Sequence, residues 1–104
     1  MVLPPAGKLV RDGIPEIIRS SGGDPELLKL DEDQYLAALR LKLVEEANEV
    51  LGADDKGLVE ELADVLEVLA ALVKANDIDW ADIERKREEK HAERGGFQNR
   101  FWLV

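Results

Sequence analysis

The sequence predicts an all-α protein, a helical bundle built on an antiparallel two-helix hairpin with a third, C-terminal helix and a short N-terminal helix. Apolar residues make up 45% of the 104 positions but aromatic residues only 5%, so Leu, Val, Ile and Ala must build most of the core. That mixture favours helices over a β-sandwich. Two long stretches also repeat apolar residues at spacings of three and four. Because no change of composition marks a linker, we expect residues 1–104 to form a single domain.

The N-terminal part contains one short predicted helix. Residues 8–13 are expected to be extended, and Pro15 follows at a point where the first turn of a helix tolerates its missing N–H group. Gly22 and Gly23 end this helix, because glycine is a poor helix former. Residues 26–30 are too few to distinguish a brief strand from a helical turn, and both alternatives stay open.

The first long helix is predicted over residues 32–51. Asp31 and, three positions later, Gln34 form a capping-box pattern ahead of a periodic stretch. The apolar positions recur at spacings of three and four, so this helix is expected to bury one face. These positions are Leu36, Leu39, Leu43, Ala47 and Val50.

The second long helix, over residues 58–75, is predicted to run antiparallel to the first. Residues 52–57 form a short connection rich in Gly and Asp, which leaves room only for a reversal of the chain. Glu60, Glu67 and Lys74 are spaced by seven and mark the exposed line of this helix. Its apolar stripe comprises Leu58, Leu62, Val65, Leu69 and Leu72.

A final helix is predicted from the cap residue Asp79 to about Arg94. Residues 76–79 interrupt the preceding helix, and Gly95-Gly96 ends the final one because glycine permits left-handed backbone angles. Five apolar residues follow, which is too many for a free tail, so we expect them to pack on the bundle or on a partner subunit. They are Phe97, Phe101, Trp102, Leu103 and Val104.

Charge and length restrict the possible partners and location. The formal net charge of -9 argues against binding to nucleic acid or to an anionic membrane, so an anionic ligand is expected to come with a divalent cation. A chain of 104 residues buries only a moderate core, which favours a homo-oligomer, a dimer or a tetramer. Residues 1–7 form a lead-in without the apolar stretch of a signal peptide, and cysteine is absent. We therefore expect a cytoplasmic protein.

Four acidic residues carry the predicted chemistry. Glu46 and Glu49 form a Glu-x-x-Glu pair on one arm of the hairpin, and Glu61 and Asp64 form a Glu-x-x-Asp pair on the other. Residues three apart share one face of a helix. Because residues at the same level of an antiparallel hairpin have position numbers with a constant sum, Glu46 should face Asp64 and Glu49 should face Glu61. The four carboxylates are therefore expected to converge.

A carboxylate on a partly apolar face is expensive to bury unless it is paired or binds a metal. Glu61 and Asp64 lie off the exposed line of their helix, on the side that carries Val65. Clusters with oxygen ligands alone suit hard cations, so Mg²⁺, with Mn²⁺ as the alternative ion, is the predicted cofactor. The competing interpretation is that these acids are solvated and pair with lysines, as Glu46 would with Lys42 one turn away.

Basic residues on the final helix are candidate phosphate contacts. The stripe that begins with Trp80 and Ile83 continues at the same spacing through Arg87, Lys90 and Arg94. Basic groups aimed toward the bundle would bind phosphates well, and arginine does so with a bidentate fork. A solvated helix with ion pairs to neighbouring glutamates explains the same residues equally well.

Three blocks of the sequence resemble the MazG-like all-α nucleotide pyrophosphohydrolase superfamily. Glu-Glu-x-x-Glu at 45–49 with Glu-Leu-Ala-Asp at 61–64 is similar to its signature, and residues 8–18 and 86–97 are similar to the ends of its small phosphoribosyl-ATP pyrophosphohydrolase-like branch. The resemblance implies a helical, oligomeric enzyme that uses Mg²⁺ to hydrolyse a nucleoside triphosphate. It also implies that the four acids are the metal ligands.

The resemblance extends to candidate phosphate-binding residues at both ends of the chain. It implies that Lys90 and Arg94 contact phosphate, and Lys8 and Arg11 are further candidates near the N-terminus. Gly13 stands where the family pattern has a basic residue, which weighs against a phosphate role for the N-terminal segment. The alternative for Arg11 is a structural ion pair with the aspartate that follows it.

The predicted function is hydrolysis between the α and β phosphates of a nucleoside triphosphate, which gives the monophosphate and pyrophosphate. Removal of non-standard or excess nucleotides is the leading role. Two alternatives stay open: a phosphoribosyl-ATP pyrophosphatase of histidine synthesis, and a non-catalytic bundle that binds nucleotides or another protein. Base recognition usually depends on apolar or aromatic contacts, and the candidates are Trp80, Phe97 and Trp102.

Overall fold

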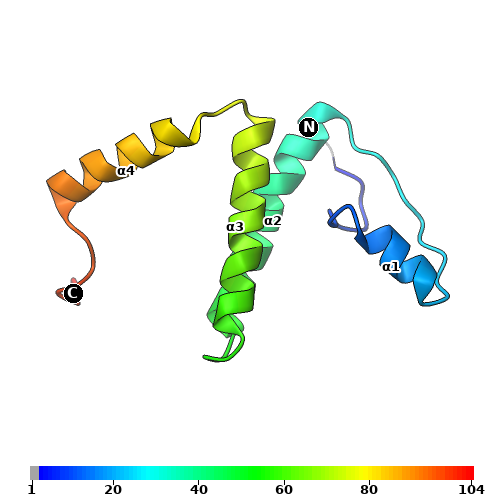
Figure 1. Cartoon of the computed structure of the whole chain (residues 1–104), viewed down its shortest axis with the longest axis horizontal. Coiled ribbons are helices and arrows are strands. Elements are labelled where there is room, and N and C mark those ends of the chain that lie inside the picture. Colours follow the sequence, from blue (N-terminus) through cyan, green and yellow to red (C-terminus); the bar gives the residue numbers. More distant parts are fainter. Residues whose placement is uncertain (1–2) are drawn as a thin grey trace.

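The computed structural model describes residues 3–104, a range that contains four helices and no strand (Figure 1). The helices are α1 (Ile14–Ser20), α2 (Glu32–Gly52), α3 (Leu58–Ala75) and α4 (Trp80–Arg94). The predicted all-α class is confirmed, and the three longer helices begin and end within one residue of their predicted bounds. Residues 1 and 2, which belong to the predicted lead-in, lie outside the described residues.

Local hydrogen bonds that the sequence predicts determine where the helices begin. The Asp31 side chain accepts from the backbone N–H of Gln34 at 2.8 Å, and the Gln34 side chain accepts from the backbone N–H of Asp31 at 3.0 Å, which completes the capping box of α2. The Asp79 side chain accepts from the N–H of Ala81 at 3.0 Å and caps α4. Gly95 follows α4 with a φ of 78°, an angle that few other residues adopt.

The hydrophobic core lies between α2 and α3, which run side by side as an antiparallel hairpin (Figure 1). Four buried side chains from the two helices form it: Ala38, Leu39, Val68 and Val73. The predicted exposed line of α3 is confirmed at Glu60, Glu67 and Lys74. The hairpin therefore holds the buried core, and it positions the side chains on the facing sides of α2 and α3.

The predicted apolar stripes are wrong near the loop of the hairpin. Ala47, Leu58 and Leu62 are exposed, although each belongs to a predicted stripe. The packing side of α3 is rotated toward Glu61 and Asp64, both of which are half-buried. This rotation places two acids between the helices, where a predicted apolar contact would otherwise stand.

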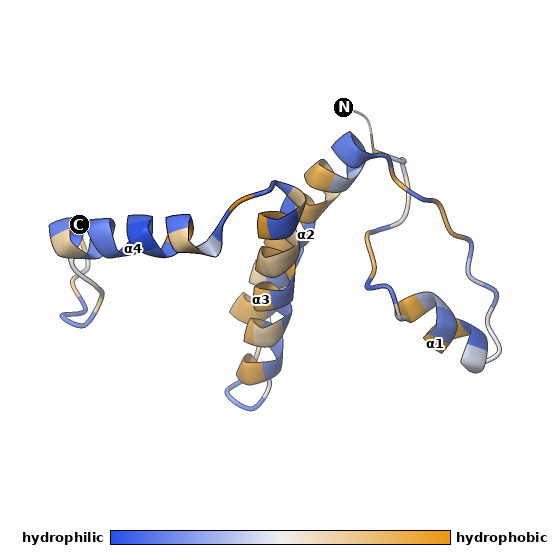
Figure 2. Cartoon of the chain, turned by 45° about the horizontal axis from the view of Figure 1, so that its top comes forward, coloured by the Kyte–Doolittle hydropathy of each residue, from blue (hydrophilic) through white to orange (hydrophobic). Residues whose placement is uncertain are grey.

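The last part of the chain leaves the hairpin, so the predicted packing of the C-terminal segment on its own bundle is wrong. Figure 1 shows α4 extending away from α3, and Phe97 and Trp102 are 98% and 89% exposed. The reason is composition: α4 is almost entirely polar (Figure 2), and Ile83 is the one residue in it that is half-buried. A helix with so little apolar surface gains little by docking on the hairpin.

The resulting chain is open. Its radius of gyration is 17.4 Å, whereas a compact chain of this length has a radius of about 13 Å. Apolar side chains on the outer sides of the hairpin are exposed as well, among them Leu41, Val44 and Leu66. No helix in the range 3–104 combines the length and the apolar character that a membrane span requires.

The N-terminal part forms a loop around α1 that returns to α2 (Figure 1). Residues 26–30 adopt neither of the two alternatives expected for them, because they have no regular secondary structure. Together with residues 3–12 they line a cavity against α2. Two segments far apart in the sequence are thus brought to one side of the hairpin.

Candidate metal centre

Three of the four predicted acids converge between the arms of the hairpin. Glu46 of α2 and Glu61 and Asp64 of α3 each offer a carboxylate oxygen that lies within 4.8 Å of the other two. All three residues are half-buried. The antiparallel register of α2 and α3 therefore places Glu46 opposite the acidic pair of α3, as the sequence predicts.

Glu49 does not join this group of three. It is exposed and lies three positions closer to the hairpin loop than Glu46. Its charge nevertheless acts on the cluster, because the pKa of Glu61 is raised above its usual value, first by burial and then by the carboxylates of Glu49, Asp64, Glu46 and Glu60. Like charges held this close favour either a proton or a cation.

Lys42 is one of two cations that contact the cluster. The Nζ atom of Lys42 lies 3.4 Å from a Glu46 carboxylate oxygen and 3.3 Å from one of Glu45. The ion pair expected if the acids were merely solvated is thus present at Glu46. Among the described residues no cation pairs with Glu61, so the lysine does not neutralise the whole cluster.

Arg11 connects the N-terminal segment to the same site. Its Nη2 atom lies 2.6 Å from the Oδ1 atom of Asp64, which is 53 positions away in the sequence. The expected alternative, an ion pair with the adjacent Asp12, is therefore replaced by a long-range pair. Lys8 lines the same cavity as Arg11, and of these two N-terminal cations Arg11 is the one in contact with a predicted acid.

The basic residues of α4 lie elsewhere. Arg87, Lys90 and Arg94 line a hollow formed by α4 and the segment that follows it, and Arg87 is 3.5 Å from Glu84 in an exposed ion pair. Because α4 does not pack on the hairpin, the predicted stripe does not bring these cations to the acids of the same chain (Figure 1).

The aromatic residues predicted to contact a base are also displaced from the acids. Trp80 begins α4, and Phe97 and Trp102 follow that helix in the exposed C-terminal segment. Tyr35, on the first turn of α2, is the aromatic residue that lines the cavity containing Arg11 and Lys42. Sequence reasoning named the pair of Lys42 with Glu46, but it missed Tyr35 and the second contact of Lys42 with Glu45.

A comparison with known families decides the class to which this arrangement belongs. The family model for phosphoribosyl-ATP pyrophosphohydrolase matches residues 23–91, which contain α2, α3 and most of α4. The chain belongs to this family. The resemblance to the MazG-like superfamily is thereby confirmed, since the phosphoribosyl-ATP pyrophosphohydrolase family is part of it. The family is described as phosphoribosyl-ATP pyrophosphohydrolase.

A second comparison gives a relative without an assigned function. An uncharacterized protein of Mycolicibacterium smegmatis is 51% identical over 49 residues, which is 47% of this chain and 50% of that protein. The chain thus matches about half the length of this relative. No solved structure matches the chain.

The acids of the cluster fit a divalent metal ion. The family is typically metal-dependent, and three carboxylates with no nitrogen or sulfur ligand suit a hard cation. Oxygens that share an octahedral Mg²⁺ lie about 3 to 4.2 Å apart, given bonds of about 2.1 Å. The observed separations of up to 4.8 Å need only small side-chain rotations to reach these values.

Proposed function

We propose that this protein hydrolyses nucleoside triphosphates between the α and β phosphates in a reaction that depends on Mg²⁺ and removes non-standard or excess nucleotides. One observation carries the proposal: Glu46, Glu61 and Asp64 bring carboxylate oxygens within 4.8 Å of one another in a chain of the pyrophosphohydrolase family. Nucleotides of this kind occur in the cytoplasm, which is the location we propose.

The roles of the residues follow from their places in the site. Glu46, Glu61 and Asp64 would hold the cation, and Glu49 adds negative charge beside Glu61. When bound, the cation supplies neutralising charge for the phosphate oxygens and a nucleophilic water. Arg11, already in contact with Asp64, is placed to bind phosphate oxygens at the edge of the cluster.

We also propose that the protein acts as a homo-oligomer, a dimer or a tetramer. The open shape and the exposed apolar side chains of the hairpin and of the C-terminal segment support this proposal. In such an assembly the α4 cations Arg87, Lys90 and Arg94 would reach the acids of a neighbouring subunit, whereas in one chain they lie apart from them.

The second candidate function is the pyrophosphatase reaction on phosphoribosyl-ATP in histidine synthesis. The description of the matching family favours it directly. The two candidates require the same metal centre and the same bond cleavage, so they differ only in the nucleoside part of the substrate.

The experiment is a product analysis with matched variants. Purified protein is incubated with Mg²⁺ and a panel of canonical and modified nucleoside triphosphates, together with phosphoribosyl-ATP, and the products are separated by chromatography. We expect pyrophosphate and the monophosphate, and loss of both products in Glu46→Gln and Asp64→Asn. Glu67→Gln, on the exposed line of α3, is the control because it removes the same charge away from the cluster.

The outcome separates the candidates. Turnover of triphosphates supports the removal of nucleotides, and turnover of phosphoribosyl-ATP alone supports the role in histidine synthesis. Release of diphosphate and inorganic phosphate would contradict α–β cleavage, and no turnover of any compound would favour a bundle that only binds nucleotides or protein.

A further inference from the structure

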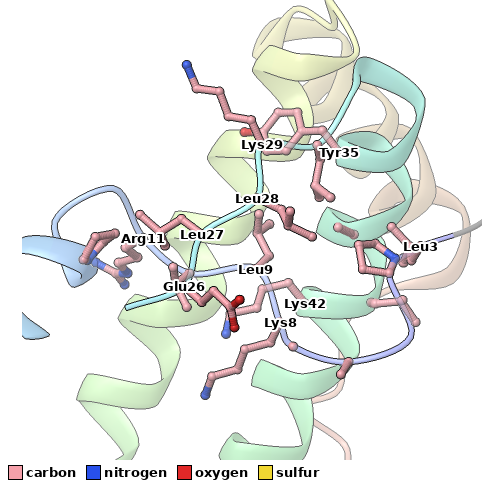
Figure 3. A pocket seen from close by; sticks show the side chains of 18 of the residues that line it. Leu3, Lys8, Leu9, Arg11, Glu26, Leu27, Leu28, Lys29, Tyr35 and Lys42 are labelled. Carbon is pink, nitrogen blue, oxygen red and sulfur yellow. The ribbon is translucent and has the colours of Figure 1, made fainter. Parts of the chain in front are cut away.

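A cavity of about 950 Å³ lies between residues 3–12, residues 26–30 and α2 (Figure 3). Its volume falls in the range of about 300 to 1,000 Å³ that is usual for small-molecule sites. Leu27, Leu28 and Leu41 line it, and each of these side chains is more than half exposed. Folding therefore leaves apolar surface uncovered around a concave space.

The two ends of this cavity differ in chemistry. Figure 3 shows Tyr35, with Lys29 beside it, at one end, and Lys8 and Lys42, with Glu26 beside them, at the other; Leu9 and Leu28 lie between the two ends. The tyrosine offers a flat apolar ring, and Lys8 and Lys42 offer positive charge. A ligand that matches both ends carries a flat ring at one end and negative charge at the other.

The cationic end is continuous with the metal centre. Arg11 and Lys42 both line the cavity, and each also contacts one of the acids: Arg11 lies 2.6 Å from Asp64, and Lys42 lies 3.4 Å from Glu46. Lys42 is only 16% exposed, so its ammonium group is held between the cavity and the acid. A molecule in the cavity would therefore extend its charged end directly toward the carboxylates.

We propose that this cavity binds the base and sugar of the nucleotide, with Tyr35 stacked on the base and the phosphates directed past Arg11 and Lys42 to the acids; this inference rests on the proposed function. Aromatic stacking tolerates any base, whereas the leucines restrict the shape of the ring. Residues 3–12 precede the range that matches the family model, so this part of the wall lies outside the matched residues.

The test separates binding of the nucleoside from binding of the phosphates. Isothermal titration calorimetry with Mg²⁺ measures the affinity for the adenosine and uridine 5′-(α,β-imido)triphosphates, which resist α–β cleavage, and for inorganic tripolyphosphate. Leu28→Asn and Tyr35→Ala should weaken the nucleotide analogues by about tenfold, as expected for loss of an apolar contact. Both variants should bind tripolyphosphate like the parent, and Tyr35→Phe should keep the affinity for the analogues.

A matched control and a second measurement keep the outcomes distinct. Ile17→Asn makes a comparable apolar-to-amide change at an exposed position of α1, outside the cavity, and should leave all affinities unchanged. Parent-like affinity for the analogues in both cavity variants would overturn the proposal, and so would an equal loss of analogue and tripolyphosphate binding. If the cavity variants differ from the parent in sedimentation mass but bind the analogues with the same affinity, a second copy of the chain fills the cavity and the proposal is wrong.

Failure of the proposed function would look different from failure of this site. A parent protein that binds the analogues but cleaves no triphosphate would refute the function, while the comparison of variants would still decide where the base binds. A parent that cleaves triphosphates with unchanged KM in Leu28→Asn and Tyr35→Ala would refute the cavity alone.

Discussion

Replacement of Asp64 by asparagine should change stability very little without metal. The Asp64 carboxylate lies within 4.8 Å of that of Glu46, and at this separation two like charges repel by about 0.9 kcal/mol in a water-like dielectric. The substitution also breaks the exposed 2.6 Å pair with Arg11, and such surface pairs contribute about 0.2 to 1 kcal/mol. Because the two effects oppose each other, the metal-free melting temperature should stay within a few degrees of the parent value.

The same substitution should remove most of the stabilisation by Mg²⁺. At a metal concentration of ten times Kd, mass action adds about 1.4 kcal/mol to the free energy of unfolding of the parent. For a domain of this size that is roughly 6 to 11 °C in melting temperature. Asparagine at position 64 supplies no negative charge, and a Kd weakened about tenfold leaves about 0.4 kcal/mol, or roughly 2 to 3 °C.

The assay is differential scanning calorimetry in EDTA and in Mg²⁺ at constant ionic strength. Glu67→Gln is the control, because it removes one charge from the same helix on its exposed line. A full Mg²⁺ shift in Asp64→Asn, or an equal loss of the shift in Glu67→Gln, would show that the cation acts by general screening and would refute the metal centre.

Three further predictions concern pH, folding and assembly. The pKa of Glu61 is raised above 4.5 in the folded chain, so the folded state binds more protons than the unfolded state just above that pH, and the metal-free free energy of unfolding should fall as the pH rises through this window. Denaturant unfolding in EDTA measures this dependence on pH, which should be weaker in Glu61→Gln. The same dependence in the variant and the parent would contradict the assignment. Asp31→Ala removes the capping box of α2 and should cost about 1 kcal/mol, or roughly 4 to 8 °C in melting temperature. Light scattering should give a mass of at least two chains, with a melting temperature that falls on dilution; a single-chain mass at every concentration would contradict the proposed oligomer.

Much of the local structure follows from the sequence alone. Asp31 and Gln34 mark the start of α2, and Gly95 marks the end of α4, because caps are formed by residues only a few positions apart. The short connection between the long helices requires an antiparallel hairpin. Once that reversal is given, the level of Glu46 opposite the pair on α3 follows from counting residues.

The side of α3 that packs against α2 could not be predicted from the sequence of α3 alone. Leu62 belongs to the best apolar periodicity of the helix, yet Val68 is buried and Leu62 is exposed. Side-chain fit between the two helices selects the packing side, and this fit depends on both partners at once. For the same reason Glu49, although predicted to converge with the other acids, remains exposed outside the group of three.

Only the tertiary structure shows which distant segments of the chain are in contact. Arg11 and Asp64 are 53 positions apart, and no local pattern relates them. Tyr35 borders a cavity because residues 26–30 return to α2 after α1. The sequence pattern of α4 pointed its cations toward the bundle, but a helix with almost no apolar surface gains no hydrophobic free energy by docking, so its position is left to the tertiary structure and to the proposed assembly.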